Sequence, residues 1–247
     1  MAWLLRDAEG LQELALAPCH EWLSDEDLVP VLARNPQLRS VALAGCGQLS
    51  RRALGALAEG CPRLQRLSLA HCDWVDGLAL RGLADRCPAL EELDLSHNLI
   101  GDRGARAAAK LLSHSRLRVL NLANNQVRAP GAHSLAHALG HNSNLISLNL
   151  RLNCIEDEGG QALAHALHTN KCLTTLHLGG NELSEPTATL LSQVLTINTT
   201  LTSINLSCNH IGLVSQGFWG TQGQGEALGA WAEGLESDCC RCLPGNC

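Results

Sequence analysis

Three side chains of the types used in nucleophilic catalysis stand close together near the middle of the chain. Asp94, Ser96 and His97 are the acid, nucleophile and base types of a catalytic triad. A triad needs these side chains to converge in space, and near neighbours on one extended strand cannot do so. We therefore expect them to belong to a variable surface, and we do not expect the chain to be an enzyme.

Histidines at helical spacing are the second candidate for chemistry. His133, His137 and His141 recur every four positions, which aligns imidazoles on one helical face and would suit zinc. The positions 28 residues further on carry Gln161 and His165. The equivalent face of the next repeat is therefore polar but does not keep the histidines that would bind zinc. We interpret these histidines as polar residues opposite an Ala/Leu stripe, and the sequence predicts no metal site and no cofactor.

Cysteines are frequent at the end of the chain. Cys239, Cys240, Cys242 and Cys247 lack an accompanying histidine or a second spaced pair, so they do not form a zinc motif. Pro244 stands four places from the end, where prenylation requires cysteine. We expect residues 213–247 to form an irregular, oxidisable tail, in which residues 225–236 could form a makeshift last helix.

A repeat of 26 to 28 residues organises the rest of the chain. Each unit begins with Leu-x-x-[Leu/Val/Ile]-x-Leu-x-x-[Cys/Asn], whose alternation predicts a short strand, and continues with apolar residues at helical spacing. This leucine-rich-repeat pattern predicts an α/β solenoid, a horseshoe with a concave parallel sheet and convex helices, of about eight repeats. The units open at Leu11, Leu38, Leu64, Leu90, Leu117, Leu145, Leu173 and Leu201.

The ninth position of each unit is Cys in the first three repeats and Asn in the later five. Both residue types can donate a hydrogen to backbone carbonyls that would otherwise be buried without a partner at the turn after the strand. We therefore predict a structural ladder and not a redox or metal site. Its members are Cys19, Cys46, Cys72, Asn98, Asn125, Asn153, Asn181 and Asn209.

The repeats are of two kinds. The early ones end their helices at motifs such as Cys61-Pro62, because proline stops a helix. The later ones end at residues such as Asn142, after a helix about two residues longer. We predict cysteine-containing leucine-rich repeats over residues 1–92, ribonuclease-inhibitor-type repeats over 93–212, and the tail over 213–247.

Each kind resembles a known family. Residues 4–93, including CPRLQRLSLAHCDWVDGLALRGLADRCPALEEL, closely resemble the repeats of the F-box/LRR-repeat proteins, which are substrate receptors of ubiquitin ligases. In that family an F-box ahead of the repeats contacts the ligase. The first repeat here opens so near Met1 that no F-box is expected, so this resemblance implies only a surface that binds a ubiquitin-ligase substrate.

Residues 93–212 resemble a second family. The segment, which begins LDLSHNLIGDRGARAAAKLLSHSRLRVLNLANNQV, looks like the repeats of the T-complex-associated testis-expressed proteins. The resemblance implies a place among the axonemal dynein regulatory subunits of motile cilia and flagella. The chain therefore looks like a fusion of two repeat arrays, and engineering, recombination and a gene-model error are all compatible with it.

Composition argues against several classes of partner. The net charge is −6, and the chain contains no Tyr and one Phe, so it has neither the basic patch nor the aromatic surface that binds nucleic acid. Charged residues such as Arg6, Asp7 and Glu9 interrupt the N-terminal apolar run, so no signal peptide and no membrane span is expected. We expect a cytoplasmic protein, and a cilium or flagellum axoneme if the second resemblance holds.

Residues between the strand leucines are expected to face outward from the concave sheet and to bind a protein partner. Three functions remain open: a ciliary scaffold, slightly favoured by the longer resemblance; the substrate-recognition part of a ubiquitin-ligase receptor; and a chimeric repeat protein with no native function. The terminal repeats lack obvious polar caps and are expected to fray. The predicted interface residues are Arg66, His71, Glu92, Asp94, His97, Asn121, Asn124, Asn149, Arg151, His177 and Asn205.

Overall fold

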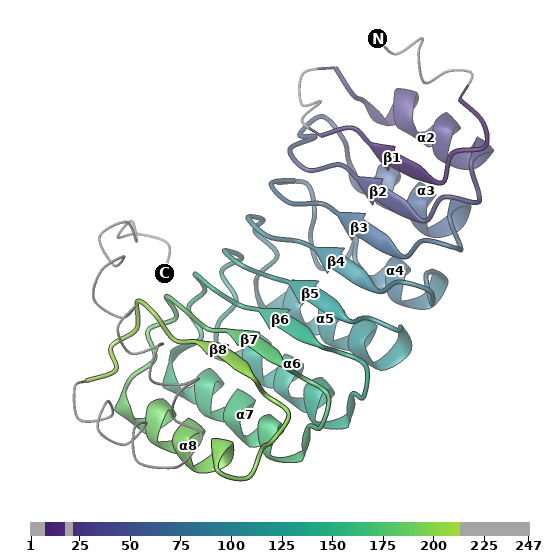
Figure 1. Ribbon diagram of the computed structural model, residues 1–247. Coiled ribbons are helices and arrows are strands. Elements are labelled where there is room, and N and C mark those ends of the chain that lie inside the picture. The colour runs from purple at the N-terminus through teal and green to yellow at the C-terminus, as the bar shows by residue number, and fades with distance from the viewer. Residues whose placement is uncertain (1–7, 18–21, 213–247) are drawn as a thin grey trace.

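The computed structural model describes residues 8–17 and 22–212, which form one curved stack of strand and helix units (Figure 1). Within these residues, eight strands alternate with seven helices, which confirms the predicted leucine-rich-repeat solenoid. Cys19, the tail cysteines and the helix predicted over 225–236 lie outside the described residues.

The strands have three residues each, and the helices range from 6 to 14 residues. The strands are β1 (Glu13–Ala15), β2 (Ser40–Ala42), β3 (Arg66–Ser68), β4 (Glu92–Asp94), β5 (Val119–Asn121), β6 (Ser147–Asn149), β7 (Thr175–His177) and β8 (Ser203–Asn205). The helices are α2 (Asp25–Arg34), α3 (Arg51–Gly60), α4 (Arg81–Arg86), α5 (Gly101–His114), α6 (Ala129–His141), α7 (Glu156–Thr169) and α8 (Glu185–Leu195).

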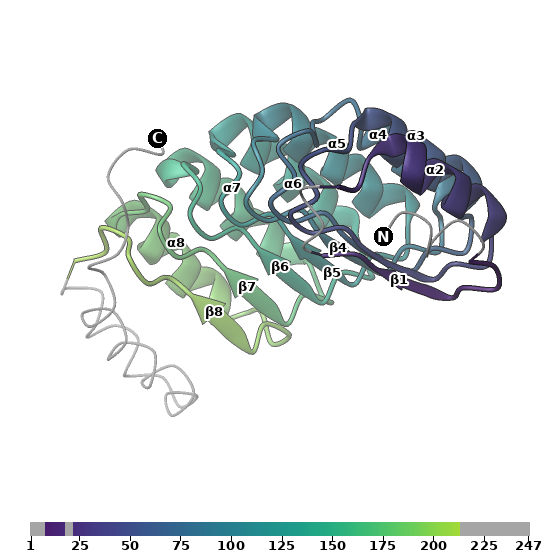
Figure 2. The ribbon, with the colours of Figure 1, turned by 90° about the horizontal axis from the view of Figure 1, so that it is seen from above.

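The strands form one parallel sheet in the order β1 to β8, and the helices cover one face of it (Figure 2). Equivalent positions pair directly, as Leu67 with Leu93 and Leu93 with Leu120. Neighbouring strands lie about 4.8 Å apart whereas packed helices need about 8–10 Å, so the stack curves with the sheet inside. The middle residue of every strand is buried: Leu14, Val41, Leu67, Leu93, Leu120, Leu148, Leu176 and Ile204.

The ninth position of each repeat forms an inner ladder, whose described members are Cys46, Cys72, Asn98, Asn125, Asn153, Asn181 and Asn209. Asn98 Nδ2 donates to the carbonyls of Leu69 and Leu95 at 2.8 Å, and its Oδ1 accepts from the amide of Cys72 at 2.7 Å. Cys72 Sγ donates to the Leu43 carbonyl at 3.2 Å, and burial raises the pKa of this thiol to about 11, so the thiol keeps its proton. Each rung joins its own repeat to the preceding one.

The asparagines of the inner ladder are not equivalent. Asn153 Oδ1 accepts from the amides of Asn125 and Val127, at 3.0 and 2.9 Å. The Oδ1 atoms of Asn125 and Asn181 are buried and have no hydrogen-bond partner among the described residues. The Asn153 side chain therefore both donates and accepts hydrogen bonds, whereas the Asn125 side chain only donates them.

A second, outer ladder runs along the ends of the helices, where the sequence analysis recognised only helix termini. Its asparagines are Asn35, Asn142, Asn170 and Asn198. Asn170 Nδ2 donates to the carbonyls of Leu139 and Asn142, at 2.8 and 3.2 Å, and its Oδ1 accepts from the amide of Leu173 at 2.8 Å. In the second and third repeats, Cys61 and Cys87 end the helices instead.

Aspartates at three helix starts bond to the start of the next helix along the stack. Asp102 Oδ1 accepts from the amides of Arg128 and Gly131, at 2.8 and 3.0 Å. Asp157 likewise accepts from the Ser184 amide at 2.9 Å, and Asp25 from the Ser50 amide at 3.1 Å. A carboxylate there bonds amides that the helix leaves unpaired and opposes the positive end of its dipole.

No helix within residues 8–17 and 22–212 is both long enough and apolar enough to cross a membrane.

Candidate protein-binding site on the concave sheet

The structure places all eleven predicted interface residues on strands or directly after them. Seven lie on strands β3 to β8, while His71, His97, Asn124 and Arg151 follow their strands. Five of the strand residues occupy one register column, in which each pairs with the next along the sheet. We call this set the polar column: Asp94, Asn121, Asn149, His177 and Asn205.

Local hydrogen bonds fix most of the polar column. The Oδ1 atoms of Asn121, Asn149 and Asn205 accept from the amide two residues further on, at 3.2, 3.1 and 3.0 Å. Asp94 makes the same bond to Ser96 at 3.0 Å. Such turns orient the side chain before any partner binds, which lowers the entropy lost on binding.

A second column lies where the chain leaves each strand in a left-handed conformation. His71, His97 and Asn124 have φ of 56°, 57° and 54°, and Gly45 and Gly180 occupy the same place in other repeats. The His71 and His97 rings stack with their centroids 4.2 Å apart, and Asn124 Nδ2 lies 2.9 Å from His97 Nδ1. These three side chains thus form a continuous row across three repeats.

Two histidines of the site have lowered pKa values. Burial lowers the pKa of His97, and the neighbouring His71 lowers it further against the opposite effect of Asp94. Burial also lowers the pKa of His177, and the charge of Arg151 adds to this. The lowered pKa values favour the uncharged form of both imidazoles near neutral pH.

The charged side chains differ in how they are engaged. Arg66 Nη2 bonds to Glu13 Oε1 at 2.8 Å, and Arg66 Nε donates to Ser40 Oγ at 3.4 Å. The Glu92 side chain is exposed and makes no hydrogen bond or ion pair with any other described residue. Glu92 can therefore bind a partner without first breaking an internal contact.

The structure does not assemble the triad types into a relay. Ser96 Oγ donates to Asp94 Oδ1 at 2.8 Å, whereas the ring of His97 contacts His71 and Asn124. On α6, His133 Nε2 lies 3.4 Å from Glu158 Oε1, and the His137 and His141 rings are 5.2 Å apart. Across residues 8–17 and 22–212, no group of three or more His, Cys, Asp or Glu is arranged to hold a metal ion.

Two apolar residues of the concave side were missed by the sequence analysis. Val119 and Leu152 are each 39% exposed. Val119 pairs with Glu92 in the register, and Leu152 occupies the left-handed column, since its φ is 55°. Both residues could have been found by aligning the repeats position by position, because the equivalent positions of other repeats hold predicted interface residues.

A curved parallel sheet with a half-buried polar column on its open face and helices behind it defines a leucine-rich-repeat protein, and this chain belongs to that class. The family described as "Leucine Rich repeat" matches residues 114–136, 141–164, 169–186 and 198–214. The family described as "FBD-associated F-box protein At5g56370, LRR repeats" matches residues 2–106.

Short segments are highly similar to parts of curated proteins. F-box/LRR-repeat protein 15 of Mus musculus is 97% identical over 61 residues, 25% of this chain and 20% of the relative. The Rattus norvegicus protein of that name is 98% identical over 58 residues, 24% of this chain and 19% of the relative. Dynein regulatory complex subunit 5 of Macaca fascicularis is 78% identical over 50 residues, 20% of this chain and 10% of the relative.

The chain thus spans a fifth or less of the length of these curated relatives. Among solved structures, Leiomodin-1 Actin-Binding Site 2 (ABS2) matches with a TM-score of 0.42 and 25% identity, over 46% of this chain and 66% of that chain.

Proposed function

We propose that the chain is a non-catalytic scaffold that binds a protein partner through its concave sheet. The observation that supports this most directly is the polar column, in which five outward residues lie side by side on consecutive strands. Most of its side chains are held by local hydrogen bonds, and the row of His71, His97 and Asn124 extends along it. A long, pre-oriented polar surface suits a large partner better than a small ligand.

Two partner classes follow from the segment similarities. The similarity to dynein regulatory complex subunit 5 supports axonemal dynein regulatory subunits as partners, in a cilium or flagellum. The similarity to F-box/LRR-repeat protein 15 supports recognition of a ubiquitin-ligase substrate in the cytoplasm. The second alignment is both longer and closer, so it offsets the slight preference that the sequence analysis gave to the ciliary role.

Affinity capture with the full chain distinguishes these alternatives. Recovery of dynein regulatory subunits from ciliated-cell extract supports the first, and recovery of cullin-ligase components or their substrates supports the second. If the chain retains neither while it is folded, it behaves as a chimeric repeat protein without a native partner.

Charge reversal tests the concave site itself. Arg66→Glu, Glu92→Arg and Arg151→Glu should each weaken the captured interaction by about fivefold or more, because each residue lies within the proposed interface. Lys171→Glu is the matched control, since Lys171 is exposed but lies in the loop before β7. The concave site is wrong if all three variants bind as the control does while their melting temperatures are unchanged.

A further inference from the structure

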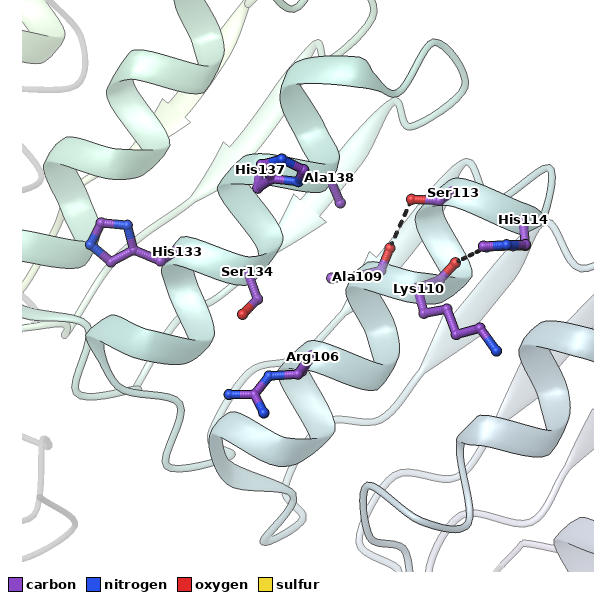
Figure 3. Close-up of a pocket in the computed structure, with 9 residues that line it drawn as sticks. All are labelled: Arg106, Ala109, Lys110, Ser113, His114, His133, Ser134, His137 and Ala138. Atoms are coloured by element: carbon purple, nitrogen blue, oxygen red, sulfur yellow. Dashed lines mark hydrogen bonds between the residues drawn. The ribbon is translucent and has the colours of Figure 1, made fainter.

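A groove on the convex side carries a concentration of cationic and titratable side chains. It lies between α5 and α6, has a volume of about 460 Å³, and is lined by Arg106, Lys110, His114, His133 and His137 together with small residues such as Ser134 (Figure 3). All five of these basic or imidazole side chains are exposed. Helices α5 and α6, whose residues line the groove, lie on the opposite side of the sheet from its concave face (Figure 2).

The cations of the groove differ in their internal contacts. Lys110 extends away from α6, and its Nζ bonds to Asp85 Oδ1 of α4 at 2.8 Å. His133 Nε2 lies 3.4 Å from Glu158 Oε1 of α7. Arg106 extends from α5 into the groove, and its guanidinium makes no hydrogen bond or ion pair with another described residue. A bound carboxylate would therefore meet Arg106 without first displacing an internal acid.

Carboxylates do not line the groove, although they stand at both of its borders. Asp85 and Glu158 are paired as described, while Asp102 and Asp157 bond to the start of the next helix along the stack. The groove itself therefore presents only positive or neutral groups. The charged and titratable residues of the packed elements are Arg81, Asp85 and Arg86 on α4, Asp102, Arg103, Arg106, Lys110 and His114 on α5, His133, His137 and His141 on α6, and Glu156, Asp157, Glu158, His165 and His168 on α7.

We propose that this groove binds an acidic segment of a partner protein, with Arg106 bonding a carboxylate. A guanidinium presents two parallel N–H groups to a carboxylate, so this pairing is directional as well as electrostatic. Charge complementarity along an open groove indicates an acidic protein segment as the partner.

Other anionic partners fit the groove less well. Residues 101–141 contain no Phe, Tyr or Trp, so nucleic-acid bases have no stacking surface there. None of the exposed large apolar residues of the described chain lies on α5 or α6, so the groove offers nothing to insert into a membrane. The cations lie along two helices without converging on one point, which favours several spaced carboxylates over one phosphate.

The test uses the full chain and fluorescein-labelled octaglutamate, with binding followed by fluorescence anisotropy. We expect the peptide to bind the wild type and to raise the anisotropy. Arg106→Gln should weaken binding about fivefold, while circular dichroism shows the fold intact.

The matched control is Arg63→Gln, which removes the same kind of group from an exposed position in the turn before β3. The proposal is overturned if this control weakens binding as much as Arg106→Gln does, or if octaglutamate does not bind. It is also overturned if inorganic phosphate displaces the peptide more effectively than chloride at equal ionic strength. Retention of the chain by anionic vesicles but not by octaglutamate would likewise contradict it.

Discussion

His97 lies flat against His71, with the ring centroids 4.2 Å apart and the ring planes inclined by only 10°. The two residues occupy equivalent positions of neighbouring repeats, and both leave their strands with a left-handed backbone. The His71 ring disfavours a charge on the His97 ring, because the two lie within a few ångströms of each other. The stack therefore connects two neighbouring repeats, and the surface that they share depends on whether His97 is protonated.

Replacement of His71 should raise the pKa of His97. Burial is the largest cause of the lowered pKa of His97, and His71 is the next. His71→Gln removes the second imidazole ring and part of the cover that it gives to His97. Nuclear magnetic resonance titration of the His97 ring should show the pKa moving upward in this variant, and His210→Gln, far along the stack, should leave it unchanged. A pKa for His97 at or above the ordinary value in the wild type would contradict this account.

The same shift has a consequence for stability. The folded pKa of His97 is below the unfolded one, so the unfolded state binds the proton first, and stability falls as the pH drops from about 6.5 towards the folded value. His97→Gln should lose less stability than the wild type over that interval. Urea unfolding at several pH values measures this slope, and identical slopes in the two proteins would count against it.

Asn153→Ala should be more destabilising than Asn125→Ala, although both side chains are buried and belong to the inner ladder. Asn153 donates to the carbonyls of Leu122 and Leu150 and accepts from two amides, whereas Asn125 Oδ1 accepts none. Each buried group left unpaired costs about 1–3 kcal/mol, so we expect a loss of about 3–5 kcal/mol against about 1–3 kcal/mol. Urea denaturation followed by circular dichroism tests the order, and equal losses would show that the acceptor bonds are unimportant.

Asp157→Ala should weaken the start of α8, which lies in the following repeat. Burial alone would raise the pKa of Asp157, but hydrogen bonds from Ser184 and Thr187 outweigh it and hold the pKa below its usual value. We expect a loss of about 1–2 kcal/mol at neutral pH, typical of a lost helix cap. Because the folded pKa is depressed, this stabilisation is present above about pH 4 and is lost as the pH falls through the folded pKa.

The unfolding free energies of the wild type and Asp157→Ala should therefore converge in acid. Glu158→Gln is the control, since the neighbouring Glu158 carboxylate is exposed and, among the described residues, contacts only His133. A constant difference between wild type and Asp157→Ala at every pH would show that the charge of Asp157 is not what stabilises α8.

Two glycine substitutions should act in opposite directions. A Cβ at Gly159 would lie 2.6 Å from Ile155 Cγ2 and 2.8 Å from Ala132 Cβ of α6, so Gly159→Ala should destabilise by about 1–3 kcal/mol. A Cβ at Gly55 would meet nothing within 4 Å, so Gly55→Ala should stabilise α3 by up to about 1 kcal/mol. Thermal unfolding measures both, and a tolerated Gly159→Ala would mean that α6 and α7 can separate without loss.

Much of this architecture could be predicted from spacing alone. Leucines recurring every 26 to 28 residues specify the strands and their register, because identical units must stack in order to bury them. The lining of the groove beside Arg106 was not predicted, since it depends on which helix faces lie next to each other. The sequence does show both partners of the bond between Asp157 and Ser184: an acid in the first turn of one helix and, 27 positions later, the N-cap residue of the next helix. Only the packed repeats show that these two residues meet.

Asn98 bonds to Cys72 and Leu69 across the boundary where cysteine rungs give way to asparagine rungs. An amide can thus replace a thiol in mid-stack without leaving the neighbouring unit's amide or carbonyl unpaired. Repeats from different solenoids can therefore be joined wherever the turns after their strands offer the same hydrogen-bond donor. A designed solenoid could be assembled from two arrays at such a boundary, with each array chosen for the surface that it presents.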